Sequence, residues 1–162
     1  MSDFSIIELT DPQEKPAAVR QVLEALPEWF GVPESTEGYI KESAGQLCFA
    51  AYEQSCDGSA SMPLGILCLK QTGDATMELA VMGVRKEYHR RGIGCALFEA
   101  AKARASGLGC QFLQVKTVQM GRYACYDDTN RFYQSMGFRE FEVLPSLWGW
   151  HNPCQIYVMA LK

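Results

Sequence analysis

The first third of the chain changes its hydrophobic period from that of a strand to that of a helix. Phe4–Leu9 alternates loosely and predicts a strand, which the polar residues 10–12 would end. In residues 14–26 the apolar side chains recur at helical spacing. They are Val19, Val22, Leu23 and Leu26. Pro27 would end this helix.

After a loop in which the adjacent aromatic residues Trp29 and Phe30 are expected to be exposed, the pattern predicts a second helix. Ser35 or Thr36 would cap it, and it would run to about residue 44. Three strands are then predicted, separated by turn-rich segments at 56–63 and 71–74. These strands are Leu47–Glu53, 64–70 and 75–84.

The second half of the chain alternates helical and extended patterns. Alanines and other good helix formers predict a helix over 92–106, which Gly107 and Gly109 would close. A second helix, over 127–136, would place Phe132 and Met136 on one face. The remaining apolar runs predict strands at 111–118, 138–144 and 155–161.

The order of these elements is β-α-α-β-β-β-α-β-α-β-β. Consecutive strands joined by short turns pair antiparallel, whereas the crossover through the helix at 92–106 requires one parallel pair. The expected class is α/β (α+β), with a mixed, mostly antiparallel sheet of about seven strands and about four helices. At 162 residues, the chain is expected to form a single domain over 1–162.

Composition excludes several classes of function. The net charge of −4 argues against non-specific binding of nucleic acid, which needs a basic surface. No apolar run approaches the 18 residues of a membrane span, and the N-terminus lacks the pattern of a secretory signal. Seven cysteines without a C-x-x-C pair, and two histidines, do not form a metal-binding pattern. An odd cysteine count without a signal peptide suits the reducing cytoplasm.

The segment between the strand at 75–84 and the helix at 92–106 carries the clearest candidate chemistry. Gly92 and Gly94 let the backbone turn tightly, so that N–H groups can converge on a ligand. The positive end of the helix dipole lies at the same place, and Arg90 and Arg91 add charge. Strand, glycine turn and helix start together predict a pyrophosphate site.

Two common phosphate motifs do not fit this segment. A P-loop needs Lys and Ser or Thr after its last glycine, whereas Cys95 and Ala96 follow Gly94. A dinucleotide-binding fingerprint needs a third glycine, where this chain has Leu97, and follows the first strand of its unit. The glycine turn is therefore either another kind of pyrophosphate site or merely a tight turn into a helix.

The segment LAVMGVRKEYHRRGIGCALFEAA resembles the acetyl-CoA signature of the GNAT superfamily of N-acetyltransferases, Q/R-x-x-G-x-G/A. Its six positions are His89, Arg90, Arg91, Gly92, Ile93 and Gly94, with His89 in place of the usual Gln or Arg. The resemblance implies that main-chain amides from Arg90 to Cys95 bind the pyrophosphate. It also implies that Met82, Gly83 and Val84 border the thioester and pantetheine.

A second segment, TNRFYQSMGF, resembles the later helix of the same family, in which F-Y-x-x-x-G-F places a tyrosine near the coenzyme sulfur. The matching residues are Phe132, Tyr133, Gly137 and Phe138. The family often has a coenzyme-contacting asparagine seven residues before that tyrosine. Tyr126 stands there in this chain, and Asn130 is only three residues before, so Asn130 is the nearest candidate.

The resemblance implies direct attack of an amine on the acetyl thioester, with a base for the amine and a proton donor for the departing thiolate. Tyr133 is the candidate acid, although a core tyrosine is the structural alternative. Glu78 is the candidate base, on the strand face shared with Ala80, Met82 and Val84. A strand-edge carboxylate is its alternative, and the loop residue His151 is a weaker candidate for the base.

The acceptor is left open by these motifs. The expected substrate is a primary amine, most simply on a small molecule. A protein lysine or N-terminus, and a non-catalytic acyl-CoA-binding module, are the alternatives. The aromatic side chains outside the motifs could line an acceptor pocket or form a homodimer interface. They are Trp29, Phe30, Tyr39, Trp148 and Trp150.

Overall fold

The computed structural model describes residues 3–54 and 61–162. The chain forms two compact units, which are treated separately below. The N-terminal unit combines Met1–Lys70 with Ala80–Arg104, and the C-terminal unit combines Gln71–Leu79 with Ala105–Lys162. The expectation of a single domain over 1–162 stays a prediction. The predicted turn at 56–63 falls largely on residues 55–60, outside the described residues.

The seven strands follow the hydrogen-bonded order β1-β2-β3-β4-β5-β7-β6. Strand β2 pairs antiparallel with β1 and β3, and β7 pairs antiparallel with β5 and β6, whereas β4 and β5 are parallel. With four α-helices in the described residues, this confirms the predicted mixed sheet. β3 (Gly65–Gly73) and β4 (Thr76–Val84) each run through both units.

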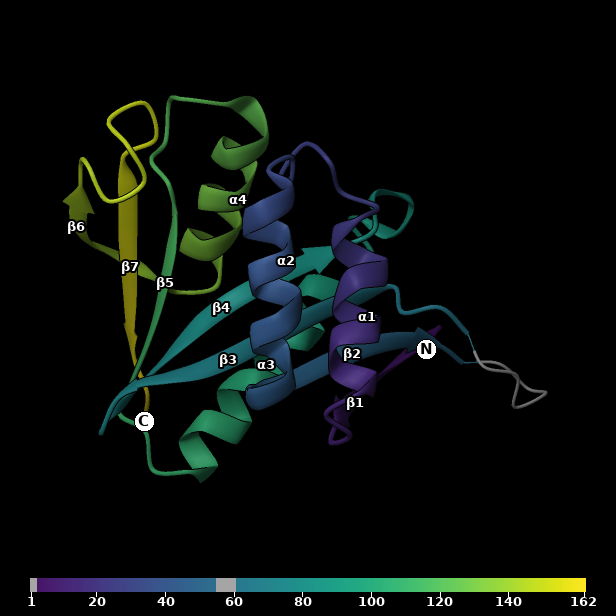
Figure 1. The fold of residues 1–162 in the computed structure, drawn as a ribbon. Coiled ribbons are helices and arrows are strands. Elements are labelled where there is room, and N and C mark those ends of the chain that lie inside the picture. Colours follow the sequence, from purple (N-terminus) through teal and green to yellow (C-terminus); the bar gives the residue numbers. More distant parts are fainter. Residues whose placement is uncertain (1–2, 55–60) are drawn as a thin grey trace. The chain divides into compact units, whose positions relative to one another are not determined.

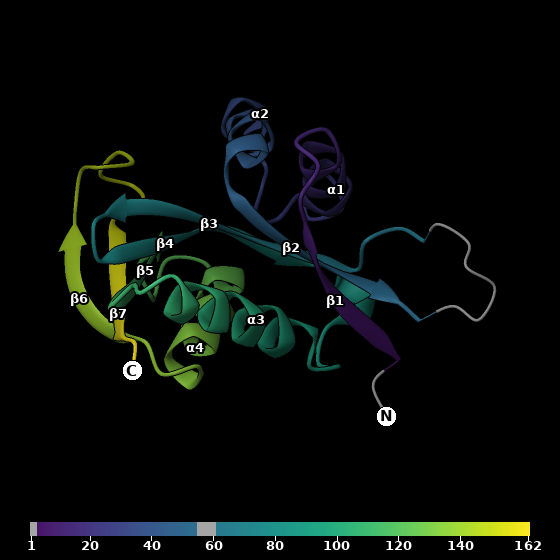
Figure 2. The same cartoon turned by 90° about the horizontal axis from the view of Figure 1, so that it is seen from below.

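In the N-terminal unit, β1 (Phe4–Leu9) pairs with β2 (Leu47–Glu53), and β2 pairs with β3. Helices α1 (Glu14–Leu23) and α2 (Pro33–Glu42) lie side by side on one face of these strands (Figure 1). Helix α3 (Ile93–Gly107) lies on the opposite face (Figure 2). The predicted apolar stripe of α1 is buried against the strands, as expected for an amphipathic helix.

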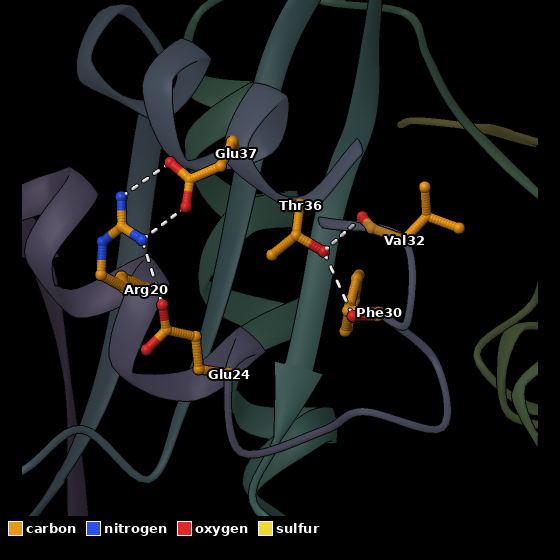
Figure 3. A network of polar contacts seen from close by, with 6 residues as sticks. All are labelled: Arg20, Glu24, Phe30, Val32, Thr36 and Glu37. Atoms are coloured by element: carbon orange, nitrogen blue, oxygen red, sulfur yellow. Dashed lines mark hydrogen bonds and ion pairs between the residues drawn. The ribbon is translucent and has the colours of Figure 1, made fainter. Parts of the chain in front are cut away.

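The predicted start of α2 is wrong by three to four residues. Val32 is the N-cap and Pro33 opens the helix, because the fixed φ of proline suits the first helical position. The hydroxyl of Thr36 therefore does not cap. It donates to the carbonyl oxygens of Val32, at 3.1 Å, and Phe30, at 3.3 Å (Figure 3).

An exposed ion-pair network joins α1 to α2 (Figure 3). The guanidinium of Arg20 donates to both carboxylate oxygens of Glu37, at 2.5 and 2.8 Å, and to Glu24 at 3.0 Å. These contacts lower the pKa of Glu37. Since all three side chains are substantially exposed, the network fixes the register of two helices more than it stabilises the fold.

The α1–α2 connection differs from its predicted character. Trp29 and Phe30 were expected in an exposed loop, but both are half-buried and pack against the core of the N-terminal unit. The cause is a turn after α1, in which the amides of Trp29 and Phe30 donate to the carbonyl of Leu26. This turn folds the two rings back over the buried face of α1.

In the C-terminal unit, Thr76–Leu79 of β4 pairs with β5 (Phe112–Val118), and β7 (Cys154–Ala160) lies between β5 and β6 (Arg139–Leu144). Helix α4 (Ala124–Ser135) lies against β5 and β7 (Figure 1).

Helix α4 begins three residues before the predicted start at Asp127. The carboxylate of Asp127 lies in the first turn, where it accepts a hydrogen bond of 2.7 Å from the amide of Gly121. The Asp127 side chain therefore binds the preceding loop from inside the helix. None of the helices in the described ranges has the length and apolar character that crossing a membrane requires.

Candidate functional site: a glycine turn at α3 and a polar cluster at β5

The backbone between β4 and α3 has the shape expected of an anion-binding loop. After a short 3-10 turn (Lys86–Tyr88), Arg90 has a φ of 63° and Gly92 a φ of 82°. Arg90 is the one non-glycine residue with positive φ in the described residues, so φ changes sign at each step from Arg90 to Gly92. Such alternation turns successive N–H groups toward one side. A left-handed arginine costs about 1 kcal/mol, which marks the loop as strained.

The loop opens directly into α3. Ala96 is the first residue of the helix whose amide donates back to Gly92, at 3.0 Å. The amides of the first helical turn, at Ile93, Gly94 and Cys95, therefore lack an acceptor within the helix and face its open end. Gly92, Arg90 and Arg91 are exposed to solvent. Such a backbone would suit a pyrophosphate, and binding at these residues stays a prediction.

His89, the departure from the family pattern, ties this loop to the end of β4. Its Nε2 lies 2.6 Å from the carbonyl oxygen of Val84, and its ring meets the Trp29 ring edge-on at 6.1 Å. Lys86 lies over the same Trp29 ring and forms an ion pair with Glu28. The loop is therefore fastened to β4 and to the α1–α2 connection, all within the N-terminal unit.

Met82, Gly83 and Val84, the predicted border of the thioester, are all half-buried. Gly83 has a packing reason to be glycine, because a Cβ atom there would lie 2.8 Å from Cδ1 of Leu26 and 3.4 Å from Cγ1 of Val22. The side chains of Val22 on α1 and of Leu26 just after it therefore pack directly against the β4 backbone at Gly83.

Glu78, the candidate base, is 5% exposed and forms an ion pair with Lys116 on β5. The distance from Lys116 Nζ to Glu78 Oε1 is 2.5 Å. The β4–β5 ladder contains four residue pairs, from Thr76 with Phe112 to Leu79 with Val115. Glu78 lies within this short ladder, and Lys116 is the first residue of β5 after it.

Asn130, proposed from the sequence as a coenzyme contact, lies fully buried in a hydrogen-bond network. Its Nδ2 donates to the carbonyls of Val118, at 2.9 Å, and Tyr126, at 2.7 Å, and its Oδ1 accepts from the Tyr157 hydroxyl at 2.6 Å. Gln134 donates to the same hydroxyl. Both amide hydrogens are already used, so Asn130 fixes the end of β5 to α4.

Tyr133, the candidate acid, is 7% exposed and lies one helical turn after Asn130. Its ring contacts the rings of Phe132, Phe138 and Tyr157 at centroid distances of 5.8 to 6.2 Å. The chain reverses immediately afterwards at Gly137, whose φ is 107°. The aromatic packing fixes the orientation of Tyr133 in the C-terminal unit.

Three neighbours of the candidate residues were not predicted from the sequence: Lys116, Tyr157 and Cys154. The one signal for Lys116 was a charged residue inside an otherwise uncharged strand, and its partner depends on ladder register. His151, the weaker candidate base, is exposed and stacks on Trp150 with a centroid distance of 3.9 Å. Within residues 3–54 and 61–162, no three histidine, cysteine or acidic side chains gather as a metal site would require.

Solved structures share this fold. A protein assigned to the GNAT family from Desulfovibrio desulfuricans is 20% identical, with 98% of this chain and 99% of that chain covered and a TM-score of 0.80. An aminoglycoside 6'-N-acetyltransferase complexed with coenzyme A is 17% identical, with 98% and 97% covered and a TM-score of 0.73. NAA60 from Arabidopsis thaliana, in complex with acetyl-CoA, is 17% identical, with 98% of both chains covered and a TM-score of 0.73. No curated protein matches the sequence.

The family model described as the acetyltransferase (GNAT) domain matches residues 44–140, which include β2 to β5, the glycine turn, α3 and α4. This is more than half of the chain. The match contains both sequence segments in which the family resemblance was first seen. The chain therefore belongs to the GNAT superfamily of acetyl-CoA-dependent N-acetyltransferases.

Proposed function

We propose that this protein transfers the acetyl group of acetyl-CoA to a primary amine of a small molecule. The observation that carries the donor half is the alternating backbone at Arg90–Gly92, which opens into the start of α3. Amides from Arg90 to Cys95 would bind the pyrophosphate, and Arg90 and Arg91 would add charge. Met82, Gly83 and Val84 would border the pantetheine.

The acetyl transfer would proceed by direct attack. The amine nitrogen forms a bond to the thioester carbonyl carbon, and the carbon–sulfur bond breaks. Glu78 takes the proton that the nitrogen loses, directly or through water, and Tyr133 gives a proton to the departing thiolate. A backbone N–H at the end of β4 would stabilise the oxyanion. Return of the proton from Glu78 to Tyr133 through solvent restores both residues.

Asn130 would act on the coenzyme indirectly. Because its amide is fully used in binding Val118, Tyr126 and Tyr157, it would position the end of β5 and the helix that carries Tyr133. The free thiols found among the described cysteines suit a reducing compartment, which supports the cytoplasm as the location.

A small acceptor is supported by the α1–α2 connection. Trp29, Phe30 and Tyr39 pack against the N-terminal core instead of presenting a flat surface to a polypeptide. The second candidate is a protein lysine or N-terminus, favoured by the exposed side chains of residues 145–151, where Trp150 is 73% exposed. The same exposed residues would serve a homodimer.

The test measures free thiol released from acetyl-CoA with polyamines, aminoglycosides, amino acids and peptides with free N-termini. We expect release with at least one small amine, and a thermal shift with acetyl-CoA alone. Release with peptides alone would move the proposal to the protein candidate. A thermal shift without any release would leave only an acyl-CoA-binding module.

A further inference from the structure

Lys116 is the one charged residue in a strand, β5, whose other side chains are apolar or neutral. Its Nζ lies 2.5 Å from Glu78 Oε1, and the side chains of the pair are 29% and 7% exposed. A carboxylate so poorly hydrated is costly unless a cation and a hydrogen-bond donor accompany it. Lys116 supplies both.

The ion pair lies where the β4–β5 ladder ends. Glu78 is on the third of four ladder pairs, opposite Gln114, and Lys116 follows the last pair, Leu79 with Val115. The hydrogen bond from Lys116 to Glu78 therefore links the two strands across the end of their ladder. A side chain held from the neighbouring strand has far fewer orientations than a glutamate held by its own backbone.

Cys154, on β7, is the third polar group of this cluster. It is fully buried, and the pKa of its thiol is raised to about 11, chiefly by burial, while Lys116 lowers this pKa and Glu78 raises it. At neutral pH the thiol is uncharged, so it does not compete with Glu78 as an anion for Lys116. The charge of Lys116 therefore acts on the Glu78 carboxylate.

We propose that Lys116 is a positioning residue for acetyl transfer and acts only through Glu78, holding its carboxylate in the orientation that removes the amine proton. This inference rests on the proposed function, in which Glu78 is the base. Because the pair is formally neutral, it offers no net charge to a cationic acceptor. Lys116 therefore affects the rate of transfer and not the binding of either substrate.

A double-mutant cycle tests this assignment, using the amine found by the release assay. We expect Glu78→Gln and Lys116→Met each to lower kcat by about 100-fold, the lower end of what a general base contributes. The double variant should be no slower than Glu78→Gln alone. KM for acetyl-CoA should stay within about twofold of wild type in all three variants. Lys116→Arg should have a kcat about tenfold higher than that of Lys116→Met, because arginine keeps the positive charge and the hydrogen-bond donors.

The matched control is the ion pair between Arg104 on α3 and Glu8 on β1, with a distance of 3.0 Å and exposures of 43% and 32%. Arg104→Met and Glu8→Gln should leave kcat unchanged. Should Lys116→Met fail to fold, Lys116→Gln replaces it in the cycle, since it keeps a donor without charge.

Three results would overturn the inference while the proposed function stands. They are a wild-type kcat in the Lys116 variant, a further loss when Lys116→Met is added to Glu78→Gln, and no recovery with Lys116→Arg. Absence of transfer by the wild-type protein to any amine would overturn the proposed function and this inference together.

Discussion

At Gly83 the side chains of Leu26 and Val22 lie close to the place that a Cβ would take. A Cβ atom there would be 2.8 Å from Cδ1 of Leu26, so this flexible side chain has to shift. We expect Gly83→Ala to lower the free energy of unfolding by about 1 kcal/mol, the lower end of the cost of overpacking. Urea unfolding measures this change. The control is Gly38→Ala within α2, where a Cβ would meet nothing within 4 Å and should stabilise by about 0.5–1 kcal/mol.

Gly92 is glycine because of its backbone conformation. A Cβ atom there would meet no other atom within 4 Å, but the φ of 82° is one that residues with a side chain rarely adopt. Alanine would resist this conformation by about 1–2 kcal/mol and turn the loop amides away from the pyrophosphate. We expect Gly92→Ala to raise KM for acetyl-CoA by about tenfold. Gly107→Ala, at the far end of the same helix, has ordinary φ and open space and should leave KM unchanged. An unchanged KM in Gly92→Ala would contradict the pyrophosphate assignment.

Helix α4 is held to its strands by one buried amide. Asn130 binds Val118 on β5 and Tyr157 on β7, so its loss leaves a buried carbonyl and a buried hydroxyl without that partner. We expect Asn130→Ala to destabilise by about 3 kcal/mol and Tyr157→Phe by about 1 kcal/mol in urea unfolding. Because the two share a bond, the double variant should cost less than the sum. Asp128→Ala, in an exposed pair on the same helix, should cost under about 0.5 kcal/mol.

The sequence predicted the elements well because their hydrophobic periods are unambiguous. The buried stripe of α1 and the alternation in β1 each follow from one helix or strand alone. The start of α2 was misplaced because Thr36, a good capping residue, binds backbone carbonyls from inside the helix. Capping preference is a local property, and here the proline at position 33 determines where the helix begins.

The candidate residues likewise divide into those that a local pattern predicts and those that depend on tertiary contacts. The glycine turn was predictable because its glycines and arginines are consecutive in the sequence. The left-handed conformation of Arg90 was not, because only glycine is expected there. The partners of Glu78 and Asn130 come from other strands, and ladder register is a tertiary property that a single sequence does not state.

The stability of the whole protein should fall in alkali because of a thiol. The pKa of Cys154 is raised by burial from 9.0 to about 11, so the unfolded chain loses this proton at lower pH than the folded chain does. Folding stability is then complete below about pH 9 and declines as pH rises toward about 11. Burial also raises the pKa values of Tyr52 and Tyr157, so these hydroxyls continue the loss of folding stability at higher pH.

Urea unfolding without acetyl-CoA, at pH values from 8.5 to 10.5, measures the slope of the unfolding free energy against pH. The two limits lie on either side of the pH at which the decline begins. We expect Cys154→Ala to flatten it and the exposed Cys95→Ala to leave it as in wild type. A slope that is equal in all three proteins would show that Cys154 does not bind its proton more tightly when folded.

The chain passes from one compact unit to the other three times, after Lys70, Leu79 and Arg104. Neither unit is therefore a continuous stretch of sequence. During synthesis, residues 71–79 emerge early but must wait for the last third of the chain before their unit is complete. A single cut anywhere between Lys70 and Arg104 would leave at least one unit in two pieces, so pieces of this protein should regain structure only when combined.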